Sequence, residues 1–542
     1  MIYRTLLIGS AFLTLAACTP TSSERMGNGM MQDKGMMGGN QGMMQGSFLP
    51  ARDKDIDALP AAKPTSVLEV KDGDAITINP ELVRATISGK NFALYAYNGQ
   101  FPGPTLKVKQ GSTFTVHVTN NIDVPTTIHW HGIRLENRFD GAAGVTQEAI
   151  QPGQSFTYTV TVPDEGMFWY HPHVREDLQQ DMGLYANLWV TPREENLYSS
   201  VNREEVLMLD DLYLEGGLPV PYGAQEADHA LMGRFGNTML VNGKTDYSLS
   251  VPRSSVVRYY ITNAANTRTF NVRFGNAKVK LVGGDAGRKE REEFVDSVIL
   301  SPSERAIVEV QFADAGTYRI ESVSPERTWL LGTVMASTSG TAGTTNDSVK
   351  ENKDIVADID VFRPFFDKPV DKTIHLSVES RMAGMMMQGN KGGMQHGMHG
   401  GITSDSVDGI EWEDPMPHMN AMSTKGNTKW KLIDEASGAE NMDINYQFKV
   451  GDKVKIRIVN DEESDGSDHP MQHPIHFHGQ RFLVLTIDGK KNENLVWKDT
   501  VLVPAGQTVD ILLDVTNPGN WMVHCHIAEH LTNGMMGLFR VQ

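Results

Sequence analysis

The chain has 542 residues, 40% apolar and 21% charged, which is ordinary globular material, too long for one hydrophobic core, and we expect two to four domains. Its formal net charge of −18 argues against nucleic acid and anionic membrane surfaces as partners, because both repel an acidic protein. Abundant turn formers and scarce helical periodicity favour β structure.

The N-terminus predicts a signal peptide followed by a lipidation site. Residues 1–17 carry Arg4 and then an apolar run that is too short to span a bilayer permanently. The segment 15–18, Leu-Ala-Ala-Cys, resembles the lipobox of bacterial lipoproteins. The resemblance implies export and a lipid anchor on Cys18, at the periplasmic or cell-surface face of a membrane. The alternative is an ordinary signal peptide with a chance cysteine.

Residues 18–66 are rich in Gly, Met, Ser, Gln and Pro, with seven methionines between Met26 and Met44. Such a composition cannot bury a core, so we predict a flexible tether. From Val67 onward, short β-branched runs alternate with turn signals to the end of the chain.

Three segments of this remaining part can be superimposed as a strand, a turn and a second strand that closes on asparagine. They run from Pro104 to Asn120, from Tyr247 to Asn263 and from Tyr446 to Asn460. A β-sandwich used three times explains the spacing better than three unrelated domains. We predict sandwiches at 67–195, 196–345 and 346–542.

The first and third units carry two His-x-His pairs each. These are His129-Trp130-His131, His171-Pro172-His173, His476-Phe477-His478 and His524-Cys525-His526. The equivalent positions of the middle unit are Val272, Phe274, Glu321 and Val323. We therefore expect a structural role for the middle unit, with a substrate role left open. Imidazoles suit zinc, copper, iron or nickel, and pairs that face each other from two domains can surround a multinuclear cluster.

The last of these pairs predicts a second metal centre. Residues i and i+2 of a strand share a face, so Cys525 should point away from His524 and His526. A thiolate, two imidazoles and a long axial thioether form the ligand set of a blue-copper site. Cys525, His530 and Met535 supply three of these four groups. Zinc would not need this cysteine with a distant methionine, so copper is favoured.

With these motifs the chain resembles the three-domain multicopper oxidases, which include laccases, bacterial copper-resistance oxidases and ferroxidases, over about residues 67–542. The resemblance implies an all-β fold of three consecutive cupredoxin-like Greek-key sandwiches and four copper ions. At the type 1 copper it implies His473, Cys525, His530 and Met535. At the type 2 copper it implies His129 and His476, and at the type 3 pair His131, His171, His173, His478, His524 and His526. The family takes single electrons from a substrate at type 1 and reduces dioxygen to water at the trinuclear cluster.

Reduction of dioxygen also consumes protons, which an acid must deliver. Asp140, nine residues after His131, matches a position where the family has an acidic residue beside the cluster, although Asp140-Gly141 is also a turn dipeptide. Some relatives have a second carboxylate directly after the last type 1 histidine, where this chain has Leu531. Glu529 is a weaker candidate for proton delivery.

A Met-rich insertion spans about 381–424. It holds nine methionines between Met382 and Met422, with His396, His399 and His418 among them. Thioethers select Cu(I), and copper-resistance oxidases have comparable insertions, which suggests a gate that collects cuprous ions; a low-complexity insert without a role is the alternative. Met471, Asp468 and His469 are candidate ligands of a substrate copper.

The sequence thus predicts an exported, lipid-anchored, monomeric multicopper oxidase. Its expected substrate is Cu(I), with dioxygen as acceptor and a role in copper tolerance. A laccase-like oxidase of phenols or aromatic amines, or a ferroxidase, is the alternative enzyme. A copper-sequestering lipoprotein is the alternative from a different class.

Overall fold

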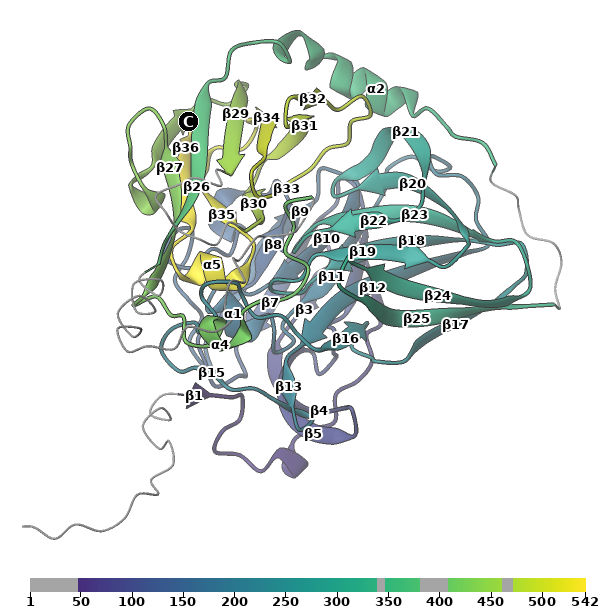
Figure 1. The fold of residues 1–542 in the computed structure, drawn as a ribbon, viewed down its shortest axis with the longest axis vertical. Coiled ribbons are helices and arrows are strands. Elements are labelled where there is room, and N and C mark those ends of the chain that lie inside the picture. The colour runs from purple at the N-terminus through teal and green to yellow at the C-terminus, as the bar shows by residue number, and fades with distance from the viewer. Residues whose placement is uncertain (1–46, 339–346, 381–407, 461–470) are drawn as a thin grey trace, which may run out of the picture. The chain divides into compact units, whose positions relative to one another are not determined.

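A computed structural model describes residues 47–338, 347–380, 408–460 and 471–542. Nearly all of its regular structure is β, and its sheets follow one another along the chain in three groups (Figure 1). The predicted fold class is confirmed. No helix of the described residues is long and apolar enough to cross a membrane.

The first group of sheets holds two His-x-His pairs. Its five-stranded sheet has the order β2 (Val67–Val70), β6 (Thr105–Lys109), β11 (Ala186–Thr191), β10 (Gly166–His171), β8 (His129–His131). A three-stranded sheet and a hairpin complete it: β3 (Ala75–Thr77), β7 (Thr113–Thr119), β9 (Ser155–Thr161), and β4 (Pro80–Ile87) with β5 (Lys90–Tyr97). Short helices are η1 (Ile56–Ala58), η2 (Asn137–Phe139) and α1 (Glu176–Gln179).

The middle group has its own apolar core. Its six-stranded sheet runs β16 (Thr238–Val241), β12 (Arg203–Leu212), β18 (Ser255–Asn263), β23 (Arg305–Phe312), β20 (Lys278–Gly284), β21 (Gly287–Val295). Its five-stranded sheet runs β17 (Tyr247–Pro252), β25 (Thr328–Ser337), β24 (Gly316–Val323), β19 (Phe270–Phe274), β22 (Val298–Leu300). Two further pairs are β13 (Leu214–Glu215) with β14 (Leu218–Pro219), and β15 (Tyr222–Gly223) with β1 (Ser47–Phe48).

The third group follows α2 (Lys353–Asp360) and η3 (Arg363–Phe365). Its six-stranded sheet runs β27 (Thr428–Asp434), β26 (Lys372–Ser380), β29 (Lys453–Asn460), β34 (Thr508–Asp514), β31 (Arg481–Ile487), β32 (Lys490–Lys491). Its five-stranded sheet runs β28 (Asn445–Phe448), β36 (Met536–Val541), β35 (Gly519–Cys525), β30 (His473–Phe477), β33 (Thr500–Val503). Short helices are α4 (Pro417–Asn420), η4 (Asn441–Asp443) and α5 (Ala528–Thr532).

The repeated asparagines do the same job in each group. The side-chain amide of Asn120 donates to the backbone oxygens of residues 124 and 150, and that of Asn263 to those of 268 and 300. Asn460 donates to the oxygens of 471 and 503. In all three groups these bonds hold the loop that leads into the strand of the first His-x-His pair or its middle equivalent, which explains why the repeat includes the asparagine.

The predicted tether is too long at its C-terminal end. Residues 47–66 carry β1 and η1 rather than continuing the tether, and Ala51 is buried. Phe48, Leu49 and Leu59 pack on the first core. The glycine- and methionine-rich composition stops before these apolar residues, which the average over 18–66 concealed.

Candidate metal centre

The histidines of the four pairs lie on, or directly after, two pairs of antiparallel strands, β8 with β10 and β30 with β35 (Figure 1). On β8 and β10, His129 lies opposite His171. On β30 and β35, His476 lies opposite His524 in the same way. The rings of His131 and His476, which come from different groups of sheets, stack with centroids 3.8 Å apart. All eight imidazoles are buried.

Acceptors on the outer side fix which ring nitrogen carries the proton in seven of the eight imidazoles. Backbone oxygens accept from the Nδ1 atoms of His129, His171, His476 and His524, at 2.7 to 2.9 Å. Carboxylates accept from His173 Nδ1 (Glu176, 2.8 Å), His478 Nδ1 (Asp140, 2.9 Å) and His131 Nε2 (Asp499, 3.0 Å). In metal sites, such outer partners set the tautomer and the ring orientation of histidine ligands.

The inner nitrogens are left as bare lone pairs. Buried ring nitrogens without a partner occur at His129, His131, His171, His173, His476 and His526. The Nε2 atoms of His478 and His524 face each other at 2.9 Å, although both rings donate from Nδ1. Two lone pairs at this distance repel each other unless a cation lies between them. The donor set therefore fits metal ions.

The electrostatics of the cluster fit as well. Ligation requires neutral imidazole, and burial lowers the pKa of His478 to about 3, with the neighbouring His129 acting in the same direction. Burial also holds the pKa values of His131, His476 and His524 well below the usual range. His173 is the exception: although its burial lowers the pKa, the carboxylate of Glu176 outweighs this and raises it.

A separate group of ligand atoms surrounds Cys525, whose side chain points away from the eight imidazoles as strand alternation predicts. Its Sγ lies 3.5 Å from His473 Nδ1 and 3.8 Å from His530 Nδ1, and these nitrogens are 3.3 Å apart. Met535 is fully buried in the same core. Burial raises the pKa of the Cys525 thiol and lowers that of His473 to about 3. A soft cation that displaces the thiol proton suits these groups.

The walls of this second group are apolar and closed. Trp430, on β27, stacks on His530 with ring centroids 4.0 Å apart and meets His473 edge-on at 4.8 Å. Its Nε1 donates to the backbone oxygen of Ala230 at 2.7 Å. Trp430 is 1% exposed, so the indole covers both imidazoles.

The described end of the Met-rich insertion docks over the same place. Asn420 and Ser423 accept hydrogen bonds from the backbone N–H groups of residues 232 and 231, at 3.0 and 2.8 Å. Met416 and Met419 are partly buried against the core that contains Cys525. The thioethers of Met416 and Met419 thus belong to the partly buried rim of the core that also contains Cys525.

Asp140 lies where the sequence predicts an acid. It ends the short helix η2, as its turn dipeptide suggests, and it also accepts from His478 with its side chain and from His129 with its backbone oxygen. Burial would raise its pKa, but these two imidazoles outweigh burial and hold the pKa well below its usual range.

Glu529 has different neighbours. Its carboxylate accepts from Thr267 Oγ1 at 3.1 Å, and burial together with Asp177 and Asp181 raises its pKa to about 8. Leu531 packs in a small apolar cluster with Met522. Glu529 therefore contacts the middle group of sheets, from which Asn266 Nδ2 also donates to its carboxylate at 3.4 Å.

Several predicted residues cannot be placed. The methionines from Met382 to Met398, together with His396, His399, Asp468 and His469, lie outside the described residues. Met471 is described and fully buried.

Sequence reasoning missed Asp499, Glu176, Trp430 and Arg305. Glu176 follows His173 by three residues at the start of α1, which was an available signal. The others touch the site only through contacts with residues distant in sequence.

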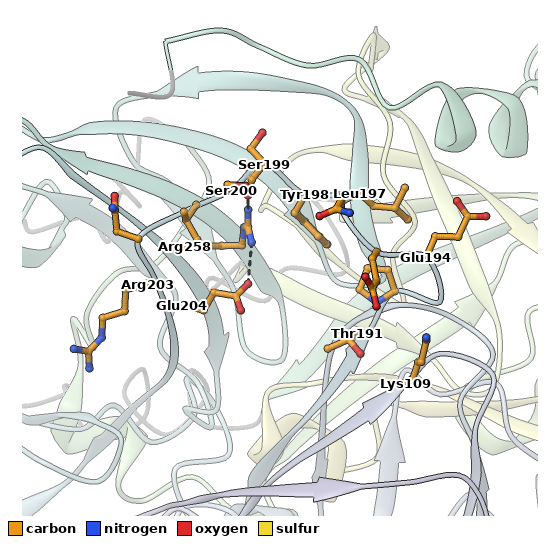
Figure 2. Close-up of a pocket in the computed structure, with 15 residues that line it drawn as sticks. Lys109, Thr191, Glu194, Leu197, Tyr198, Ser199, Ser200, Arg203, Glu204 and Arg258 are labelled. Carbon is orange, nitrogen blue, oxygen red and sulfur yellow. Dashed lines mark hydrogen bonds and ion pairs between the residues drawn. The ribbon is translucent and has the colours of Figure 1, made fainter. Parts of the chain in front are cut away.

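An open surface pocket lies away from these ligand atoms. It has a volume of about 800 Å³ and runs along the linker between β11 and β12 (Figure 2). Its lining residues include Tyr198, Glu204 and Arg258, and Arg258 donates to Glu204 at 2.8 Å. None of the cluster histidines lines it, so the metal centre is enclosed rather than open to this pocket.

The β structure holds two groups of buried side chains that could bind metal ions, a cluster of imidazoles and a Cys-His-His group. Models of the multicopper oxidase family match residues 80–195 and 411–542. The chain belongs to the multicopper oxidases, and it is an oxidoreductase.

Relatives with different names match most of the chain. A multicopper oxidase of Staphylococcus aureus is 27% identical, covering 82% of this chain and 83% of the relative. Laccase-1 of Cryptococcus neoformans is 25% identical (84% and 78%), and copper resistance protein A of Escherichia coli is 23% identical (84% and 90%). The solved multicopper oxidase of Campylobacter jejuni, titled a metallo-oxidase, shares the fold with a TM-score of 0.65 at 24% identity, covering 90% of this chain and 97% of that one.

Proposed function

We propose that the protein oxidises Cu(I) and reduces dioxygen to water. His473, Cys525, His530 and Met535 would hold a type 1 copper, and the eight paired histidines a type 2 copper and a type 3 pair. When bound, these four coppers would accept electrons singly and deliver four to dioxygen. The Escherichia coli relative is named a copper resistance protein, which supports a role in copper tolerance.

The observation that carries the choice of Cu(I) is the closed wall around the Cys525 group. Trp430 covers the imidazoles from which an organic substrate would have to draw electrons. Met416 and Met419 are partly buried against the core that contains Cys525, and their thioethers are soft donors that select Cu(I). His473 and His530 are buried, so a phenol would not contact them directly, whereas a bare ion needs only ligands along its way.

The polypeptide links the two centres directly. His524 and His526 flank Cys525 in the chain, and neighbouring residues of a strand are only ~3.3 Å apart. Asp140 contacts His478 and His129, so it is the residue that we assign to proton handling. Glu529 remains the second candidate.

Oxygen uptake by the copper-loaded protein tests the proposal with Cu(I), Fe(II) and a phenol as alternative reductants. The variant Met416→Leu/Met419→Leu conserves volume but removes both thioethers, and Met442→Leu, at an exposed methionine elsewhere, is the matched control. We expect a higher KM for Cu(I) in the double variant only. Equal Cu(I) kinetics in both variants, or faster oxidation of the phenol than of Cu(I) by the unchanged protein, would contradict the proposal. Absence of oxygen uptake with every reductant would favour copper sequestration.

We also propose export and lipid attachment through Cys18, which rests on segment 1–18 alone. Labelling with a radioactive fatty acid in a bacterial host should mark the protein, and Cys18→Ser should abolish the label.

A further inference from the structure

Arg305 connects all three groups of sheets at one guanidinium. It begins β23 of the middle group and is 1% exposed. Its Nε donates to the backbone oxygen of Met167 on β10, at 2.7 Å, and one terminal nitrogen donates to Ser303, at 2.8 Å. Both terminal nitrogens donate to the carboxylate of Asp499 in the third group. The middle group, which lacks metal ligands of its own, thus reaches the copper cluster.

Asp499 in turn accepts hydrogen bonds from two cluster histidines. Its Oδ1 accepts from His131 Nε2 at 3.0 Å and from the hydroxyl of Thr500 at 3.0 Å. Its backbone oxygen accepts from His476 Nδ1 at 2.8 Å. A bidentate pair of arginine and carboxylate fixes the plane and position of the carboxylate, so Arg305 determines where these acceptors lie.

The backbone next to His131 is built around the same carboxylate. Gly132 has φ +79°, and a Cβ atom at this position would lie 2.2 Å from Asp499 Oδ2. The glycine of this His-x-His-Gly motif is therefore needed both for its backbone conformation and for the approach of Asp499.

His131 differs from the other cluster histidines. It presents Nδ1 inward, whereas the inward lone pairs of the others belong to Nε2. Its Nε2 is directed outward because Asp499 accepts from it. We infer that Arg305 is a positioning residue of the copper cluster, which holds Asp499 so that His131 offers Nδ1 to the metal. The inference rests on the proposed use of His131 and His476 as copper ligands.

Substitutions at both ends of the pair separate this role from simple packing. Arg305→Met removes both the charge and the two parallel N–H donors of the guanidinium, whereas Arg305→Lys keeps the charge without the planar pair of donors. Asp499→Asn keeps the shape of the acceptor but removes its charge. Arg258→Met is the matched control, because Arg258 is a buried arginine of the same sheet, paired with Glu309 at 2.7 Å and away from the cluster histidines.

The experiment uses the copper-loaded full chain and measures three quantities. These are copper ions per chain, the rate at which ascorbate bleaches the blue band without oxygen, and the rate at which dioxygen restores it. Outer partners of metal ligands typically contribute about 10- to 100-fold to affinity or activity. We expect a loss of that size in copper affinity at the imidazole cluster or in reoxidation for Arg305→Met and Asp499→Asn, a smaller loss for Arg305→Lys, and unchanged bleaching.

Reoxidation and copper content equal to those of Arg258→Met would overturn the inference. If Arg305→Met does not fold, the near-isosteric Asp499→Asn decides by the same criterion. Because ascorbate is the reductant, the result does not depend on Cu(I) being the substrate. An unchanged protein that binds copper only at Cys525 would overturn both this inference and the cluster assignment in the proposed function.

Discussion

The two candidate metal centres lie beside each other on β35, but different kinds of side chain surround them. Around the eight imidazoles, the outer partners are carboxylates and backbone oxygens, with Asp140, Glu176 and Asp499 contributing side chains. Around Cys525, the neighbours are an indole, methionines and an apolar core. Polar partners can orient ligands and exchange protons, whereas an apolar wall suits a centre that only transfers electrons. Under the proposed function, the imidazole cluster would serve the reduction of dioxygen and the Cys525 group the transfer of electrons.

The largest effect should come from removing the thiol. Cys525→Ser should abolish the blue colour and steady turnover, because a hydroxyl does not replace a thiolate as a copper ligand. Copper should remain at the imidazole cluster, as measured by metal content and electron paramagnetic resonance. Retention of both colour and turnover would refute the assignment of Cys525.

A smaller loss should follow at the polar centre. Asp140→Asn removes the carboxylate that orients His478 and should slow reoxidation by dioxygen about 10- to 100-fold, with anaerobic bleaching of the blue band unchanged. Stopped-flow absorbance measures both rates. Glu529→Gln serves as the comparison, and a larger effect there would transfer proton delivery from Asp140 to Glu529.

Opening the apolar wall should change specificity rather than destroy the enzyme. Trp430→Leu leaves an apolar residue but uncovers His473 and His530, so we expect phenol oxidation to rise several-fold relative to Cu(I), at a stability cost of about 3 kcal/mol by analogy with large-to-small core changes. The kcat/KM values for both substrates and the Tm measure these effects. Trp412→Leu, at another buried tryptophan, is the control; an identical phenol rate in the two variants would mean that Trp430 does not shield the site.

Acid should lower the folding stability of the copper-free protein through histidines of both centres. Folding lowers the pKa of His473 and of His478 to about 3, below the unfolded value of about 6.5. Between these pKa values the unfolded chain therefore binds more protons than the folded chain. The contribution of each histidine to the free energy of unfolding is complete above about pH 6.5, and it should fall by about 1.4 kcal/mol per pH unit as the pH drops toward 3. Denaturant unfolding of the apoprotein at several pH values measures the slope. A flat profile would show that these imidazoles are not buried neutral.

The amino-acid sequence was enough to predict the β-sandwich repeat, the four His-x-His pairs and the opposite directions of Cys525 and its flanking histidines. These features follow from local rules, since the two-residue period of a strand fixes the face on which each side chain lies. It also indicated Asp140, because that residue follows the first pair closely in the chain.

The tertiary structure was needed to show which ring nitrogen of each histidine points inward and which residues surround the ligands. Asp499 meets His131 across 368 positions of the chain, and Arg305 meets Asp499 across 194. Such contacts depend on how separately folded sheets dock, which no periodicity of a single strand encodes. For the same reason, the sequence did not indicate that Arg305 and the loop carrying Ala230, both from the middle sandwich, contact Asp499 and Trp430 beside the two groups of ligands.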